Sequence, residues 1–333
     1  MVKFFQNKEK STKTPKNLKN FQKRKVILKN KKIFDVKKYS NKVLIINSKT
    51  EWNFYYEIDK KIFLKYGNVI FSDLYEKQKK IPLISKEKIL RHKITPENRL
   101  LLIIYTLELI NVLPNKENTF FQIIYLFDKF LEKTDLILDD NLSKIYFYVC
   151  FELALKMESS VIFDSNSNIA DLFCIEHKNI DNLLELELEI LQTIDFELNI
   201  PNNILDFYQI SLYDFKINIP EIFIKNEANK ILLEQTYHST VLISKLITID
   251  PNIFYNYKAI ELNAALIIFA NSMACSIVKN YDKNIINIFE KWMKVFIENS
   301  KLDIKIIEVI YNSINNFYDN FRKKNYNLNI SFS

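Results

Sequence analysis

Apolar residues recur at intervals of three and four along most of the chain after residue 68. This spacing places them on one face of an α-helix. The prolines at positions 82, 96, 114, 201, 220 and 251 fall between the apolar runs, where proline disturbs a helix least. Before residue 68, the stretches 43–46 and 52–58 fit either minor strands or extended segments. We therefore predict an all-α protein.

A first unit of five helices is predicted from these patterns. One helix is expected to begin at Pro96, with the side chain of Thr95 as its N-cap. The next is expected to be capped by Asn118. A third helix, at about 142–157, is apolar on almost every side, as expected of a helix surrounded by others. The fourth is short, at about 169–174, and the fifth carries a predicted buried stripe of Ile180, Leu184, Leu188, Leu191 and Ile194.

A second unit follows the proline at position 201. Its predicted helices span about 226–247, 252–256, 258–278, 283–297 and 302–318. The third is again the most apolar and carries several alanines, which permit close helix contacts. The matching helix order suggests a structural duplication. The predicted domains are a basic disordered tail over 1–42, an N-terminal segment over 43–92 with a helix near 68–80, a first domain over 93–200 and a second over 201–326.

Composition argues against several classes of enzyme and site. The chain has 333 residues, 48% of them hydrophobic, which is enough for a globular core. Its single glycine, Gly67, leaves no glycine-rich phosphate loop or nucleophile elbow. The three cysteines and three histidines lack metal-ligand spacing. We expect no metal, cofactor or catalytic residue. The apolar run 262–278 is interrupted by polar residues and is too short for a membrane span of about 20 residues, so no membrane segment is expected.

The positive charge is concentrated at the N-terminus. The formal net charge is +7, and residues 1–42 hold fifteen Lys and Arg against Glu9 and Asp35. A polar segment of like charge cannot bury enough surface to offset the entropy of ordering. The basic cluster at 23–32 would suit the acidic groove of a nuclear import receptor or a nucleic-acid backbone, or it is a solvated linker.

Four sequence segments of the first unit carry a family resemblance. They are Ile-Thr-Pro-Glu-Asn-Arg-Leu-Leu-Leu at 94–102, Asp-Lys-Phe-Leu at 128–131, Ala-Leu-Lys-Met-Glu at 154–158, and Glu187 followed by Ile-Leu-Gln-Thr-Ile-Asp-Phe-Glu-Leu at 190–198. In this order and spacing they resemble a cyclin box. The chain is similar to A/B-type, mitotic-like cyclins over about residues 68–326, more weakly in the second unit. The resemblance implies two tandem five-helix cyclin boxes.

The resemblance also implies a function. The protein would be a regulatory subunit, not an enzyme, that forms a heterodimer with a cyclin-dependent Ser/Thr kinase, activates it and controls the cell cycle in nucleus and cytoplasm. Lys156 and Glu187 stand where the family contacts its kinase. Apolar residues expected to surround them are Leu153, Met157, Leu191, Phe196, Leu198, Ile70 and Leu74.

Two further sets of positions follow from the resemblance. Asp128 lies on an apolar helix face, where an unpaired buried carboxylate would cost several kcal/mol, and the family pairs it with the residue at Arg99. The family's substrate-docking patch maps to Leu101, Leu102, Tyr105, Glu108 and Lys144. Lys144 stands where the family has glutamine, which changes the charge of the patch.

Other hypotheses are a cyclin-fold transcription factor and a cyclin-like scaffold that activates no kinase. The transcription factor would be expected to carry an N-terminal zinc ribbon and basic repeats. This chain has no Cys-x-x-Cys and has its positive charge in the tail, so nucleic-acid binding is not expected. The sequence Lys-Glu-Asn at 116–118 matches a degron motif, or occurs by chance.

Overall fold

A computed structural model describes residues 60–80, 83–110, 116–158, 182–198 and 204–324. These residues belong to one compact unit. Within the described ranges the protein is all-α, and its β-type pairing is a single isolated bridge between Lys93 and Asp139. The predicted all-α fold class is thereby confirmed. The expectations for the tail over 1–42, the stretches 43–46 and 52–58, and the helix at 169–174 lie outside the described residues.

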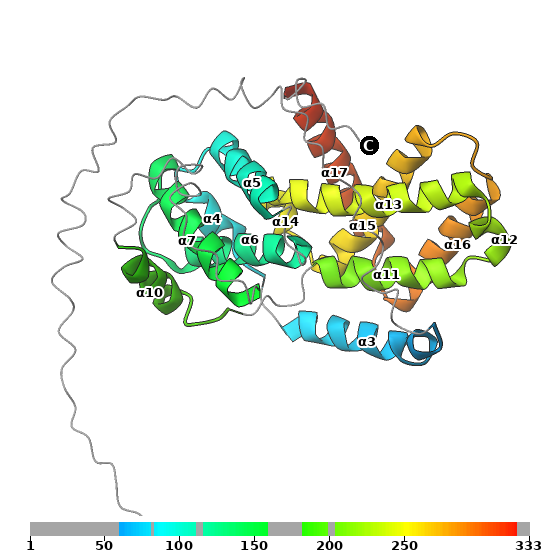
Figure 1. Cartoon of the computed structure of the whole chain (residues 1–333), viewed down its shortest axis with the longest axis horizontal. Helices are drawn as coiled ribbons and strands as arrows, with labels where there is room; N and C mark the ends of the chain where they lie inside the picture. Colours follow the sequence, from blue (N-terminus) through cyan, green and yellow to red (C-terminus); the bar gives the residue numbers. More distant parts are fainter. Residues whose placement is uncertain (1–59, 81–82, 111–115, 159–181, 199–203, 325–333) are drawn as a thin grey trace, which may run out of the picture. The chain divides into compact units, whose positions relative to one another are not determined.

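The helices form two sets that follow each other along the chain (Figure 1). The first helical set consists of α4 (Lys86–Leu90), α5 (Pro96–Ile110), α6 (Lys116–Lys133), α7 (Asp140–Glu158) and α10 (Leu183–Thr193). The second consists of α11 (Ile204–Asn218), α12 (Glu221–Ile224), α13 (Glu227–Leu246), the 3-10 helix η2 (Ile247–Ile249), α14 (Pro251–Phe254), α15 (Ala259–Ile277), α16 (Asn284–Asn299) and α17 (Ile304–Lys324). Helix α3 (Lys60–Lys80) precedes both sets.

Several helices begin where a polar side chain can satisfy free backbone N–H groups. The backbone N–H of Asn98 donates to Thr95 Oγ1 at 3.2 Å, which confirms the predicted cap of α5. At α13 the side chain of Asn226 accepts from two backbone N–H groups, and Asp250 caps α14 in the same way. The capping residues directly precede these helices in the sequence, and they determine where the helices begin.

One predicted helix start was wrong, and two helices were not predicted. Helix α6 begins at Lys116, so Asn118 lies in its first turn and is not its cap. Helix α4 was not predicted, since it is only five residues long. Helix α11 was also missed. Its buried residues Ile204, Phe207, Tyr208, Ser211 and Phe215 recur at intervals of three and four, so the sequence did carry the stripe that marks a one-sided helix.

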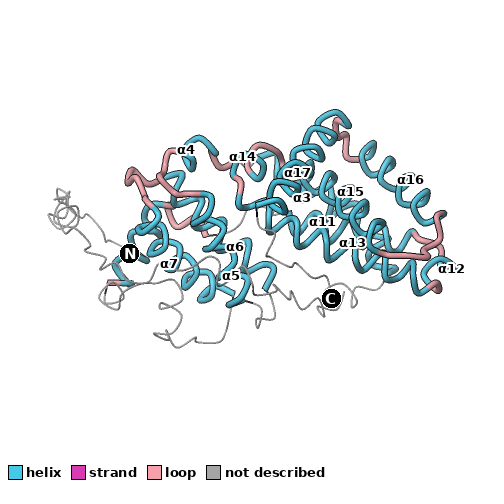
Figure 2. Tube along the Cα trace, turned by 90° about the horizontal axis from the view of Figure 1, so that it is seen from above, coloured by secondary structure: helices cyan, strands magenta, loops and turns pink. Residues whose placement is uncertain are grey.

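Each set is built around one apolar helix. Helix α7 contacts α5, α6 and α10, and residues such as Val149 and Cys150 are fully buried in it. Helix α15 contacts α11, α13 and α17, with fully buried alanines at Ala264 and Ala265. The run of α15 beside α13 is visible in Figure 2. By length and composition α15 could cross a membrane, but most of it is buried inside the protein, which is the character of a core helix.

Helix α3 packs against the second helical set. It contacts α11, and the ring of Phe71 meets the rings of Phe207 and Phe296 edge-on, with centroid distances of 5.9 Å and 5.5 Å. At its far end, the side chain of Gln78 accepts from the backbone N–H of Ile260 at 3.4 Å. These contacts anchor the segment that precedes the first helical set.

Candidate functional site: the α7–α10 surface

Lys156 and Glu187, 31 positions apart in the sequence, form an ion pair between α7 and α10. Lys156 lies in the last turn of α7, where a positive charge is favoured by the helix dipole. Its side chain is 55% exposed, whereas that of Glu187 is 14% exposed. The ammonium group is thus held by a fixed carboxylate and is still accessible to a partner.

Large apolar side chains lie exposed on the same two helices. Met157 follows Lys156 and is 41% exposed. On α10, Leu184 and Leu188 are 77% and 49% exposed. The predicted buried stripe of α10 was therefore wrong for Leu184 and Leu188. The helix buries Leu186 and Ile190 instead.

Helix α10 thus carries two apolar faces. One faces the core, and the other, through Leu184, Leu188 and the half-buried Leu191, is open. Two overlapping sets of leucines at spacings of three and four were visible in the sequence and could have indicated this arrangement. An exposed apolar helix face beside a charged pair is typical of a docking surface.

The other predicted apolar positions differ in accessibility. Phe196 is 59% exposed, and Leu198 is half-buried. Leu153 is buried in the core and so lies beneath the surface. Ile70 is exposed and Leu74 half-buried on α3, the helix that packs on α11.

Gln122 of α6 was missed by sequence analysis. Its side-chain amide donates to the backbone carbonyl of Leu198 at 2.5 Å and approaches Met157 Sδ at 3.6 Å. Gln122 itself is buried. It therefore fixes the end of α7 relative to the segment after α10, and a lone glutamine on an apolar helix gave no sequence signal for that role.

Two carboxylates lie beneath the surface, Glu152 buried and Glu189 half-buried. Glu152 lies one turn before Lys156, and burial raises the pKa of its carboxyl group, although Tyr148 and Lys156 act in the opposite direction. On α10, the carboxylate of Glu189 accepts from the hydroxyl of Tyr146 at 3.1 Å, and burial raises its pKa as well. The α7–α10 contact therefore contains polar groups that limit how the two helices can pack.

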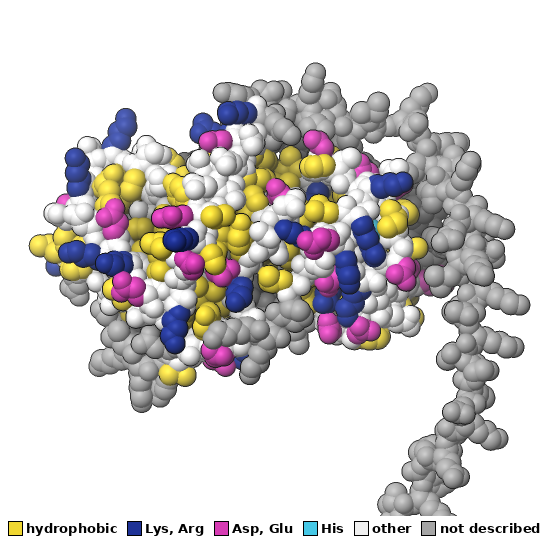
Figure 3. All heavy atoms as spheres, turned by 180° about the vertical axis from the view of Figure 1, so that it is seen from behind, with side chains coloured by type: hydrophobic (Ala, Val, Ile, Leu, Met, Phe, Trp, Pro, Cys, Tyr) yellow, Lys and Arg dark blue, Asp and Glu magenta, His cyan; other side chains and the backbone are white. Residues whose placement is uncertain are grey.

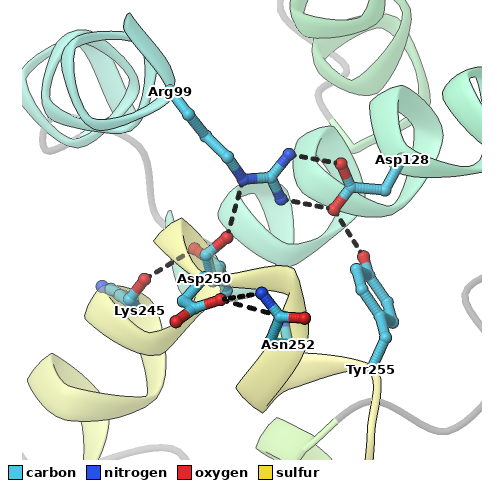
Figure 4. A network of polar contacts seen from close by, with 7 residues as sticks. Arg99, Asp128, Lys245, Asp250, Asn252 and Tyr255 are labelled. Carbon is cyan, nitrogen blue, oxygen red and sulfur yellow. Dashed lines mark hydrogen bonds and ion pairs between the residues drawn. The ribbon is translucent and has the colours of Figure 1, made fainter. Parts of the chain in front are cut away.

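Arg99 and Asp128 form the predicted ion pair, and both are buried (Figure 4). The guanidinium donates from its two terminal nitrogens to the two carboxylate oxygens, at 2.7 Å and 2.6 Å. Burial opposes the charge on Arg99, but the Asp128 carboxylate outweighs this, and the pKa of Arg99 is raised. Such a bidentate pair satisfies both charges inside the core.

The same network reaches the second helical set (Figure 4). Arg99 Nε donates to the backbone carbonyl of Thr248 at 2.9 Å, and the hydroxyl of Tyr255 donates to Asp128 Oδ2 at 2.6 Å. The predicted pair is therefore part of a larger network. Tyr255 and Thr248 lie more than a hundred positions away, and nothing local in the sequence indicated them.

The predicted substrate-docking patch is largely covered. Leu102 and Tyr105 are buried, so they do not form part of an exposed patch, contrary to what the resemblance implied. Leu101 and Lys144 are half-buried, and only Glu108 of this set is exposed. Helix α5 packs against α6, α7 and η2, which accounts for the burial of Leu102 and Tyr105.

The polar residues of the described ranges show no metal centre. In these ranges no group of three or more His, Cys, Asp or Glu could hold a metal ion. His92 instead bonds to two backbone groups: its Nε2 lies 2.8 Å from the carbonyl of Leu131, and its Nδ1 accepts from the N–H of Leu138 at 3.2 Å. Cys150 is buried and free.

Comparison with known families gives one finding. Residues 70–199 match the family model described as the N-terminal domain of cyclins. The match covers the second half of α3 and the first helical set through α10, and it supports the cyclin family and a cyclin-like regulatory role for this part of the chain. A search of curated proteins found no match.

Proposed function

We propose that this protein binds and activates a cyclin-dependent Ser/Thr kinase as its regulatory subunit. The observation that carries the proposal is the ion pair of Lys156 and Glu187, which lies beside exposed Met157 and the open leucine face of α10. The match of residues 70–199 to the cyclin N-terminal domain covers these positions, and cyclin domains generally bind such kinases. The finer similarity to A/B-type cyclins is part of the proposal.

Activation would work by docking. The ends of α7 and α10 would pack on the kinase helix that carries the glutamate partner of the ATP-positioning lysine, and so hold the kinase in its active arrangement. Lys156 would donate to kinase backbone carbonyls, while Glu187 keeps its ammonium group in place. To change the ratio of active to inactive kinase from 1:99 to 99:1, the protein must bind the active form about 5.5 kcal/mol more tightly than the inactive form. Burial of the exposed apolar face of α10 against the active kinase would supply part of this difference in affinity.

Charge on the described surface does not favour a nucleic-acid partner. On the face seen in Figure 3, Lys and Arg side chains are interspersed with Asp and Glu, whereas binding to a phosphate backbone uses clustered positive charge. The basic tail, proposed to engage a nuclear import receptor, lies outside the described residues. We propose that the protein acts in the nucleus and cytoplasm, in control of the cell cycle.

The test is to co-purify the protein with candidate kinases from its own organism and to measure phosphorylation of a histone substrate. Lys156→Ala and Glu187→Ala should each lower the affinity for the kinase at least about tenfold, because truncation of a central charged contact leaves partner groups unpaired. Lys294→Ala, at an exposed lysine of α16, is the matched control and should change nothing.

Three outcomes would contradict the proposal. If the Lys156→Ala, Glu187→Ala double variant activates the kinase as well as the wild type, the docking surface is wrong. If the folded wild-type protein captures no kinase, the result favours the non-activating scaffold. Salt-sensitive DNA binding by residues 60–333, which keep α3 whole, would instead favour the transcription-factor class.

A further inference from the structure

The chain leaves α10 through two consecutive residues in the left-handed conformation. Asp195 and Phe196 both have φ of 56°, a region that non-glycine residues rarely occupy and that is unfavourable for a bulky side chain. We call this pair the αL turn. A conformation of this kind persists only where the surrounding structure holds it, and it often occurs where a side chain must be presented for function.

Local hydrogen bonds close the αL turn. The backbone N–H of Phe196 donates to the carbonyl of Leu191 at 2.8 Å, and that of Glu197 donates to the carbonyl of Ile194 at 3.0 Å. Helices commonly end with such bonds, but usually with glycine at the left-handed position. Here the turn has aspartate and phenylalanine instead, so additional contacts are needed to hold it.

Two lysines of α6 supply these contacts. Lys133 Nζ lies 2.5 Å from Asp195 Oδ2 and 3.7 Å from Glu197 Oε2. One helical turn earlier, Lys129 Nζ lies 3.6 Å from Glu197 Oε2 and is itself only 12% exposed. Lys129 and Lys133 are thus on one side of α6, and the acidic residues flank Phe196 on both sides. We call these four residues the α6 clamp.

The αL turn also determines where Phe196 points. Its ring is 59% exposed, although burying a phenylalanine is normally favourable. Two residues after Phe196, the backbone carbonyl of Leu198 accepts a hydrogen bond from the side-chain amide of Gln122 at 2.5 Å. The backbone around Phe196 is therefore held by the α6 clamp and by Gln122. The exposed ring lies beside the surface formed by α7 and α10.

We propose that Lys133 is a positioning residue for partner binding: its ion pair with Asp195 holds the αL turn and so presents Phe196 to the kinase. The inference rests on the proposed function for the identity of the partner. The conformational part, that Lys133 and Asp195 hold the turn, is independent of it.

The first experiment measures hydrogen exchange at the backbone amides of residues 194–198 in the full-length protein. Asp195→Asn is the decisive variant, because asparagine adopts the left-handed conformation at least as readily as aspartate but lacks the charge. Asp195→Asn and Lys133→Gln should each raise exchange at Phe196 several-fold. Lys133→Arg, which keeps the charge, should retain the protection of the wild type. Lys294→Ala should leave it unchanged.

The second experiment measures affinity for the kinase that the wild-type protein captures. Lys133→Gln and Asp195→Asn should weaken binding about twofold to fivefold, in the range of an exposed ion pair, and Lys133→Arg, which keeps the charge, should bind like the wild type. Phe196→Ala should weaken binding more and should abolish the effect of Lys133→Gln, since the clamp would then have no ring to present.

The outcomes separate the two proposals. Unchanged exchange in both single variants would overturn the role of the clamp. Raised exchange with unchanged kinase affinity would overturn the positioning role of Lys133. If the wild-type protein captures no kinase, the proposed function fails, and the exchange measurement still decides whether the ion pair holds the turn.

Discussion

At the scale of single residues, buried charge is tolerated where a counter-charge and further hydrogen bonds surround the group. Asp128 has no exposed side-chain surface, yet its carboxylate accepts from Arg99 and Tyr255. The Nε–H of Arg99 donates to the backbone carbonyl of Thr248. The arrangement offsets a desolvation cost of several kcal/mol per ion. It also makes the pair dependent on partners from the second helical set.

His92 should make stability depend on pH. Burial lowers its pKa, and the neutral ring accepts at Nδ1 from the N–H of Leu138. As pH falls below about 6.5, the unfolded chain takes up a proton that the folded protein resists, so the free energy of unfolding should decrease. One such group contributes at most about 1.4 kcal/mol per pH unit.

The measurement is urea denaturation of the wild type and His92→Gln between pH 5 and pH 8. The variant should be less stable at pH 8 but should show a shallower pH dependence. His238, whose pKa is also lowered by burial, serves as the internal reference, because its contribution stays in both proteins. Equal slopes would show that His92 does not titrate differently on folding.

At the scale of secondary-structure elements, the sequence predicted a helix correctly where a single local signal marked it, such as a capping residue or a long apolar run. The start of α5 followed from Thr95 and Pro96, and α15 from an apolar run of helical length. The prediction missed α11, although buried residues of that helix such as Phe207, Ser211 and Phe215 recur at a spacing of four. It also misassigned the two apolar faces of α10, because the spacing of Leu184 and Leu188 predicts a shared face but not whether other helices cover it.

The same limit applies to the candidate site. Lys156 and Glu187 were placed by resemblance in matching segments, and the structure brings them together. Gln122 and Lys133 could not be found in that way, since their roles depend on contacts with residues 62 to 76 positions away. Residue type and local spacing carry no information about such partners.

Helix α15 should be intolerant of larger side chains. Ala265 is fully buried, and α15 contacts α11, α13 and α17. Ala265→Leu inserts three carbon atoms into this contact and should lower the free energy of unfolding by about 1–3 kcal/mol. Ile268→Leu, at a half-buried position of the same helix, conserves volume and should cost less than about 1.5 kcal/mol. Chemical denaturation compares the two, and an equal loss would contradict close packing at Ala265.

At the scale of the whole described unit, polar contacts join the first and second helical sets. The Arg99 network is one link, and the pair of Lys245 on α13 with Glu117 on α6 is another, at 3.3 Å between Nζ and Oε1. Lys245 also lies over the ring of Phe120, with Nζ 5.8 Å from its centroid. Because Glu117 is engaged in this pair within the first turn of α6, its Lys-Glu-Asn motif belongs to folded helix.

The Lys245 pair gives a test of how the two sets depend on each other. Lys245 is 7% exposed, and burial lowers its pKa while Glu117 opposes that change. Glu117→Gln leaves the ammonium group buried without its counter-charge. It should cost roughly 2–4 kcal/mol, toward the lower part of the range for broken buried pairs, because Glu117 is partly exposed. Replacing Lys245 by methionine in the same chain removes the stranded charge but keeps the apolar stem over Phe120.

The double variant Glu117→Gln, Lys245→Met should therefore be more stable than Glu117→Gln alone. Tryptophan fluorescence and far-UV circular dichroism, followed in the same denaturant series, should give coincident transitions in the wild type, as expected when the linked sets unfold together. A double variant less stable than Glu117→Gln would mean that Lys245 contributes through contacts other than its charge. Separate transitions in the wild type would mean that the links between α6 and α13 and around Asp128 are too weak to couple the two sets.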